Sequence, residues 1–271
     1  MLRAVGIASA IDFDAEQYLL RVDGIDAAQA LRHLRLYETE TRRTPPPPVP
    51  PQPYPNAVFG CLIYALVLLI IGYAVANGLW RLDAFELGEL DAQSVQSGQW
   101  WRAWTALTLH LDGAHLASNL AAGVWFGYLA ARQIGTGIAW LLIVSGAALA
   151  NLIEALLGPA THRAVGASTA VFTALGLLAA HAWRTRFHLP QRWALRWAPL
   201  VGGAVLLGWL GTAGEGTDIV AHALGFVVGV ALGACIGLPA PERALRRVPQ
   251  WLPGAAALGS IAIAWVCALS S

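Results

Sequence analysis

Seven apolar stretches, each close to the length of a bilayer crossing, dominate this sequence of 271 residues. They lie near 57–79, 113–131, 138–157, 167–183, 197–212, 217–237 and 251–270. A transmembrane α-helix needs about 20 predominantly apolar residues. Only 12% of the residues are charged, about half the roughly 25% found in soluble domains, so the chain cannot cover a water-facing surface of normal size. The sequence therefore predicts an all-α polytopic membrane protein.

Net charge and cysteine positions argue against two other classes of protein. The net charge of +1 is too small for a strongly basic nucleic-acid-binding protein, so we expect no nucleic-acid partner. Cys61, Cys235 and Cys267 all lie inside apolar runs, which argues against a disulfide framework or a zinc cluster.

The composition divides the chain into five parts. Residues 1–44 have the composition of a soluble segment, and we expect a small N-terminal cytoplasmic segment with a helical run at 27–34. Residues 45–56 are proline-rich and predict an extended linker. A six-helix core is expected over 57–237, then a cytoplasmic loop over 238–250 and an extra C-terminal transmembrane helix over 251–271.

The arginines predict the orientation in the membrane. Fourteen of the seventeen basic residues precede the first apolar segment or follow the second, fourth or sixth, whereas Arg81, Arg102 and Arg163 fall on the opposite side. Cytoplasmic loops carry the excess of basic residues. We therefore expect the N-terminus in the cytoplasm and the C-terminus outside, a topology that suits a bacterial plasma membrane.

Four polar residues fall at a similar depth inside the predicted bundle. From Ser168 to Arg184, at the inner end of the fourth helix, is roughly 24 Å, which places Ser168 roughly 6 Å below the outer boundary of a core about 30 Å thick. His222 lies roughly 7 Å into the sixth helix by the same rise. His115 and Asn119 belong to the first turns of the second helix, which enters from the same face. Because polar groups inside a membrane are costly, this agreement predicts a functional site.

The residue types at this depth suit nucleophilic catalysis. Ser168 follows a run of small residues and opens a helix, where unpaired backbone N–H groups can stabilise an oxyanion. A serine hydroxyl needs a base within hydrogen-bond reach, and His222 is the histidine on a later helix at matching depth. Gly225, Gly229 and Gly233 on that helix would allow close packing against the serine helix.

Four short motifs follow one another along the predicted core. They are Trp101-Arg102 in the long first loop over 80–112, the H-x4-H-x3-N pattern of His110, His115 and Asn119, the sequence Gly166-Ala167-Ser168, and the A-H-x-x-G-x-x-x-G pattern from Ala221 to Gly229. In this order the chain resembles the rhomboid family of intramembrane serine proteases over roughly residues 57–237. The seventh helix at 251–270 is similar to the six-plus-one class of that family.

The resemblance implies a role for each motif residue. Ser168 would be the nucleophile and His222 the general base, with His115 and Asn119 in the oxyanion hole. Supporting structural roles would fall to Gly166, His110, Trp101, Arg102 and Gly225. The implied activity is an endopeptidase that cleaves transmembrane segments of single-pass membrane proteins near the outer face, without metal or other cofactor.

One residue departs from the family pattern, and other readings stay open. Thr169 stands where the family's G-x-S-G motif has glycine, which affects the expected shape of the oxyanion site. A catalytically impaired rhomboid-like protein that binds membrane-protein clients is the alternative function. A transporter is disfavoured because the intramembrane charges are few and no repeat is evident. A metal site of His110, His115 and His222 would lack a supporting carboxylate motif.

Overall fold

The computed structural model describes residues 1–14, 17–43, 53–79, 83–186, 192–212, 217–238, 240, 244–245 and 247–271. It divides into two compact units, Met1–Gln52 and Pro53–Ser271, each of which is described by itself. Residues 45–52 of the proline-rich linker expected over 45–56 lie outside the described residues, as does residue 44. The same is true of residues 239, 241–243 and 246 in the expected loop over 238–250.

The N-terminal unit contains a β-hairpin followed by a helix. After the short 3-10 helix η1 (Leu2–Val5), strands β1 (Ser9–Asp14) and β2 (Gln17–Val22) pair antiparallel, with Ser9 opposite Val22. Helix α1 (Ala27–Arg43) includes the helical run expected at 27–34. Leu2, Ile7 and Ala30 form a small core with Val22. The sequence did not predict the hairpin, because these short strands leave their apolar side chains exposed and show no buried face.

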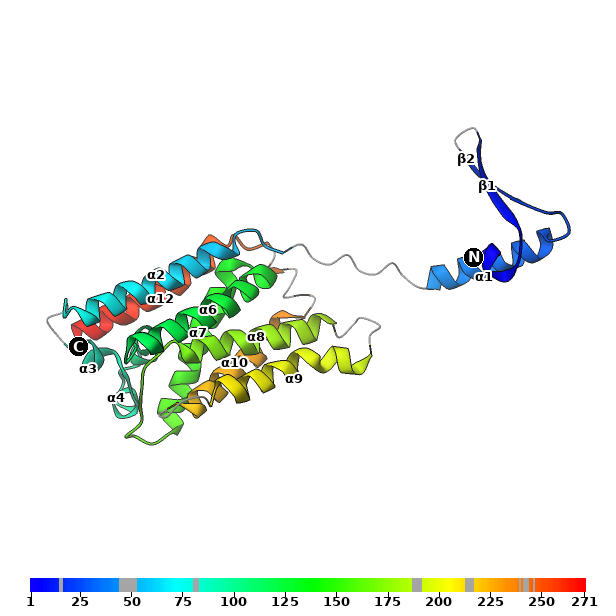
Figure 1. The fold of residues 1–271 in the computed structure, drawn as a ribbon. Coiled ribbons are helices and arrows are strands. Elements are labelled where there is room, and N and C mark those ends of the chain that lie inside the picture. Colours follow the sequence, from blue (N-terminus) through cyan, green and yellow to red (C-terminus); the bar gives the residue numbers. More distant parts are fainter. Residues whose placement is uncertain are drawn as a thin grey trace. The chain divides into compact units, whose positions relative to one another are not determined.

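The second unit is a helical bundle, and the prediction of an all-α polytopic membrane protein is confirmed (Figure 1). A long helix lies at each of the seven apolar segments, with ends within a few residues of those expected. These helices are α2 (Ala57–Ala76), α6 (Gly113–Ile134), α7 (Thr136–Leu157), α8 (Ser168–Arg186), α9 (Trp193–Leu210), α10 (Ile219–Ile236) and α12 (Trp251–Ser270).

Five of these helices are long and apolar enough to cross a membrane, within the part of the chain that the structure describes. They are α2, α7, α9, α10 and α12. Helices α6 and α8 have the required length but carry more polar side chains, among them Asn119, Ser168 and Thr173. In α6 the expected site residues His115 and Asn119 lower the hydropathy, whereas in α8 His181 and Arg184 contribute most of the decrease.

Helices α8 and α10 pack so closely that glycine is required between them. A Cβ atom added at Gly229 would lie 2.2 Å from the Thr173 carbonyl oxygen, and one added at Gly233 would lie 2.4 Å from the Leu177 carbonyl oxygen. Contacts of this length are impossible for a real side chain, so the small-residue stripe sets the distance between the two backbones. The serine helix and the histidine helix therefore lie directly against each other (Figure 1).

The long loop between α2 and α6 is folded in the part that the structure describes. It contains α3 (Ala84–Gly88), β3 (Leu90–Asp91), α4 (Ala92–Gln96), α5 (Arg102–Thr105) and the 3-10 helix η2 (Ala106–Thr108). Strand β3 pairs antiparallel with β4 (Arg163–Ala164), which lies just before the serine helix. The first loop is thereby joined to the backbone that leads into α8.

The seventh helix, α12, packs on α7 and on the first loop. A Cβ atom added at Gly137 would lie 1.7 Å from the Gln250 carbonyl oxygen, so the start of α12 approaches α7 at backbone contact distance. Near its other end, the buried indole N–H of Trp265 donates to Thr108 Oγ1 over 3.1 Å. Helix α12 therefore supports the loop from which His110 projects.

Candidate active site

Ser168, His222, His115 and Asn119 all line one cavity of about 580 Å³. The cavity lies between the first turns of α6, α8 and α10 and the segments next to them. Its wall also includes Asp112, Ala122, Phe172, Leu210 and Asp218. The four residues that the sequence placed at one depth are therefore brought together by the fold.

A sharp backbone turn places Ser168 at the start of α8. Gly166 has a φ of +131°, a conformation that L side chains rarely adopt, and its N–H donates to the Ala106 carbonyl over 2.9 Å. The Ala167 N–H donates to His110 Nε2 over 3.3 Å. Both bonds hold the turn against the first loop. The helix then begins at Ser168, where the first N–H groups lack partners within the helix and the positive end of the dipole faces the cavity.

His115 and Asn119 face this turn from α6. A Cβ atom added at Gly166 would lie 2.8 Å from both Cε1 and Nε2 of His115, and 3.7 Å from Asn119 Nδ2. Asp112 caps α6 by accepting the His115 N–H over 2.7 Å, and the Tyr64 hydroxyl donates to the Asn119 carbonyl over 2.9 Å. Two side chains able to donate hydrogen bonds therefore lie next to the turn that carries Ser168.

His222 lies in the first turn of α10 and is held from two sides. Its Nδ1 lies 2.9 Å from the Gly211 carbonyl oxygen. Because a carbonyl only accepts hydrogen bonds, this contact favours the tautomer with the proton on Nδ1 and a free lone pair on Nε2. The ring also stacks on Phe172 with a centroid distance of 4.4 Å. Asp218 caps the helix by accepting the Ala221 N–H over 3.0 Å.

His110 belongs to the loop before α6 and supports the turn. Burial, with a smaller contribution from the neighbouring His115, lowers the pKa of His110 to about 4. The imidazole is therefore neutral at pH 7 and can accept the Ala167 N–H at Nε2. The two histidine rings meet edge to face at a centroid distance of 5.1 Å. This geometry fits the supporting position that the sequence suggested for His110.

Arg102 fixes the fold of the first loop from a buried position. Its guanidinium donates to the Glu89 carbonyl over 2.9 Å, to the Glu86 carbonyl over 2.8 Å and to Gln99 Oε1 over 2.6 Å. Trp101 packs with Ile71 and Trp265 in a cluster beneath this loop. Both residues of the motif thus act on loop structure and not on the cavity wall.

The Thr169 side chain points toward α10 and away from the cavity wall. Its side chain is buried and points toward α10, where its Cγ2 would lie 3.2 Å from a Cβ atom added at Gly225. A Cβ atom at Gly225 would also lie 2.7 Å from the Thr169 carbonyl oxygen. Among the described residues Thr169 is not one that lines the cavity. Its methyl group fills the helix–helix contact, and Gly225 provides the room for it.

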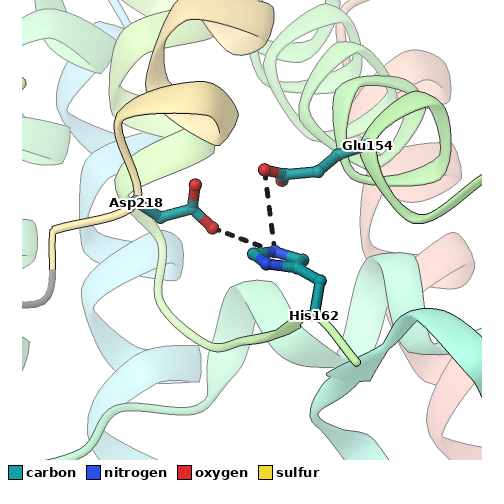
Figure 2. Close-up of side chains that lie close together, drawn as sticks. All are labelled: Glu154, His162 and Asp218. Carbon is teal, nitrogen blue, oxygen red and sulfur yellow. Dashed lines mark ion pairs between the residues drawn. The ribbon is translucent and has the colours of Figure 1, made fainter. Parts of the chain in front are cut away.

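The sequence did not single out Gly211, Phe172 and Tyr64, which position the site residues. Phe172 follows Ser168 by four residues, so it lies on the same helix face, and this spacing is the signal that could have found it. The contact between the Gly211 carbonyl and His222 could not be predicted from the sequence, because every residue has a backbone carbonyl. A group of ligand-type side chains, Glu154, His162 and Asp218, gathers at the edge of the cavity, whose wall includes Asp218 (Figure 2).

A family model described as the Rhomboid domain matches residues 97–239, a range that contains all four sequence motifs. The chain belongs to the rhomboid family. It is similar to rhomboid protease GluP of Bacillus subtilis, with 28% identity over 185 residues that cover 67% of this chain and 35% of GluP. It is also similar to the putative rhomboid protease YdcA of the same organism, with 28% identity over 127 residues that cover 46% of this chain and 61% of YdcA.

The chain thus spans about a third of the length of the first relative and less than two thirds of the second. Family membership and the helices together make it a multi-pass membrane protein.

Proposed function

We propose that this rhomboid-family protein is an intramembrane serine endopeptidase that uses Ser168 as nucleophile and His222 as general base. The observation that carries the proposal is the shared cavity, whose wall includes both the serine at a helix start and a histidine whose Nδ1 is engaged by a backbone carbonyl. The relatives named as rhomboid proteases support the same activity.

The dyad accounts for each proton in the reaction. Ser168 Oγ attacks the carbonyl carbon of the scissile peptide while His222 Nε2 takes the hydroxyl proton. Collapse of the tetrahedral intermediate breaks the C–N bond, and His222 returns the proton to the leaving amine. A water molecule then attacks the acyl ester with His222 again as base, which releases the carboxylic acid product and restores the serine. The Gly211 carbonyl stabilises the imidazolium formed in each half of the cycle.

The oxyanion hole is formed by donors that the fold already points at the turn. We assign it to the Ser168 N–H together with the side chains of Asn119 and His115, which flank Gly166. Hydrogen-bond donors that are fixed in place before the reaction stabilise the developing charge without reorganisation, and each is worth about 10²–10³ in kcat. The helix dipole of α8 adds to this stabilisation.

The substrates we propose are transmembrane segments of single-pass membrane proteins, cleaved near the outer face. Peptide groups in a helix are hidden in backbone hydrogen bonds, so a substrate must unwind locally before Ser168 can reach its carbonyl. This requirement favours substrate segments with glycine, proline or other weak helix formers near the cleavage site. The proposed orientation has the N-terminus in the cytoplasm, the C-terminus outside and the cavity near the outer face of a bacterial plasma membrane.

The alternative, a client-binding protein without catalysis, rested on Thr169. Because that side chain packs between α8 and α10 and not into the cavity, it gives little support to an impaired site.

The test compares wild type, Ser168→Ala and His222→Ala in proteoliposomes with a single-pass reporter protein. Cleavage by wild type only, with both variants unfolding at the wild-type temperature, is the expected result. If wild type does not cleave any of several reporters but still binds them, the client-binding role replaces the protease.

A further inference from the structure

Three ligand-type side chains from different elements meet at the edge of the catalytic cavity. Glu154 comes from the last turn of α7, His162 from the segment before β4, and Asp218 from the N-cap of α10 (Figure 2). His162 Nε2 lies 3.1 Å from Asp218 Oδ2 and 3.6 Å from Glu154 Oε1. One ligand atom of each residue lies within 4.8 Å of the other two.

Each of the three side chains has a buried polar atom without a hydrogen-bond partner. Glu154 Oε2, His162 Nε2 and Asp218 Oδ2 are buried atoms with no hydrogen-bond partner among the described residues. The Glu154 side chain is only 5% exposed, while those of His162 and Asp218 are about 22% and 23% exposed. A buried carboxylate that lacks a partner is costly. A cation held between the two carboxylates and the imidazole nitrogen would remove this cost.

The spacing of the three atoms fits a bound metal ion. Ligand atoms that lie about 2.0–2.2 Å from a tetrahedral zinc ion are roughly 3.3–3.5 Å from each other. The two histidine contacts, at 3.1 and 3.6 Å, bracket this separation. Ligands of one metal point at the ion and not at each other, which agrees with the lack of a hydrogen bond between His162 Nε2 and Asp218 Oδ2 at 3.1 Å.

The backbone around the cluster holds the ligands in place. The His162 N–H donates to the Pro159 carbonyl over 2.9 Å, and the His162 carbonyl accepts the Ala92 N–H over 3.0 Å. Asp218 keeps its capping bond to Ala221 through Oδ1, which leaves Oδ2 free to face the cluster. The site is therefore preorganised by an α7 end, a tethered loop and a capped helix start.

We propose that Glu154, His162 and Asp218 form a binding site for a divalent transition-metal ion of the zinc type. The ion neutralises the two carboxylates and joins the end of α7, the segment that leads to Ser168, and the start of α10. Imidazole and carboxylate together suit such ions, and three protein ligands leave a fourth position for water. Because Asp218 stands one turn before His222, the bound ion fixes the start of the histidine helix. Metal binding itself does not depend on the proposed protease activity.

The test measures binding of Zn²⁺ to the tag-free full chain in detergent after removal of metal with a chelator. Isothermal titration is expected to give one Zn²⁺ per chain, and Co²⁺ as a spectroscopic probe is expected to show the visible absorption of a four- or five-coordinate site. His162→Ala and Glu154→Gln should each weaken binding by more than about tenfold. His33→Ala, which removes an imidazole from the N-terminal unit, and Ser168→Ala should bind Zn²⁺ as tightly as wild type.

Thermal unfolding shows whether the variants remain folded. Zn²⁺ should raise the unfolding temperature of wild type and Ser168→Ala, because a ligand that binds only the folded state stabilises it. It should not raise that of His162→Ala or Glu154→Gln. The proposal is overturned if wild type shows no saturable Zn²⁺ binding, or if binding to both ligand variants equals that of wild type. If Ser168→Ala loses proteolysis but still binds Zn²⁺, the metal site and the protease activity are tested independently of each other.

Discussion

The closeness of α8 and α10 makes Gly229→Ala the most informative change outside the dyad. The new Cβ would lie 2.2 Å from the Thr173 carbonyl oxygen and 2.9 Å from the Leu177 nitrogen, both backbone atoms. An ordinary contact starts at 3.4 Å, so the two helices must separate by about 1 Å at this point. Overpacking of this kind costs about 1–3 kcal/mol of stability.

The larger effect should be on catalysis. Ser168 and His222 stand on the two helices that separate, and a misplacement of about 1 Å at reacting groups can cost about 10²-fold in rate. We therefore expect Gly229→Ala to lower the rate of reporter cleavage by about two orders of magnitude and to lower the unfolding temperature by several degrees.

A matched control is available on α9. Gly208 has no atom within 4 Å of an added Cβ, so Gly208→Ala should leave the rate of cleavage unchanged and should not destabilise the protein. The assay follows cleavage of a single-pass reporter in proteoliposomes, together with thermal unfolding of each variant. If Gly229→Ala cleaves the reporter at the wild-type rate and unfolds at the wild-type temperature, the contact between α8 and α10 does not set the geometry of the proposed dyad.

Four further predictions follow from single contacts. Gly166→Ala places a Cβ 2.8 Å from His115 at a φ of +131°, so cleavage should fall at least about 100-fold in the reporter assay; equal activity would contradict this role of the turn. Thr169→Gly should lower the free energy of unfolding by about 1–2 kcal/mol without raising cleavage, because a buried contact with α10 is lost, and increased cleavage would show that threonine restrains the site. Trp265→Phe removes the indole N–H bond to the first loop and should lower the unfolding temperature by a few degrees, whereas an unchanged melt would mean that α12 does not support the loop. Burial lowers the pKa of His110 to about 4, so the folded protein keeps this histidine neutral and its full stabilising effect is present above pH 6.5. The free energy of unfolding should fall by at most about 3 kcal/mol as the pH drops from 6.5 toward 4. In equilibrium unfolding of His110→Gln, the free energy of unfolding should fall less over the same pH range.

The long helices could be predicted from the sequence because a bilayer imposes their length and composition. Apolar runs of about 20 residues can satisfy their backbone groups in lipid only as helices. The ends agree less well, as at α9, which begins at Trp193 and not near 197. Interfacial tryptophans and arginines tolerate both the helix and the adjoining loop, so composition does not define where a helix ends.

The short elements could not be predicted because tertiary contacts define them. Strand β3 has two residues and exists only because it pairs with β4, which is about 70 residues away in the chain. The N-terminal hairpin likewise lacks a buried face that would produce an alternating pattern.

The candidate site was predictable in its members but not in its geometry. The depth argument selected Ser168 and His222 from positions along predicted helices, and the fold places both in one cavity. The sequence could not show that the Thr169 side chain points toward α10, because the direction of a side chain around a helix depends on where the helix begins. The sequence did not indicate the group of Glu154, His162 and Asp218, because its members come from three separate elements and no motif spacing links them.

Covalent labelling of the nucleophile tests the central claim most directly. The purified protein is treated with a fluorophosphonate in detergent, digested and mapped by mass spectrometry, with Ser168→Ala as the control. We predict a single adduct on Ser168 that is absent from Ser168→Ala and lost in His222→Ala, because the hydroxyl reacts only when the imidazole takes its proton. A folded protein that carries no adduct, or carries it on another residue, would contradict the assignment of Ser168 and His222 as a catalytic dyad.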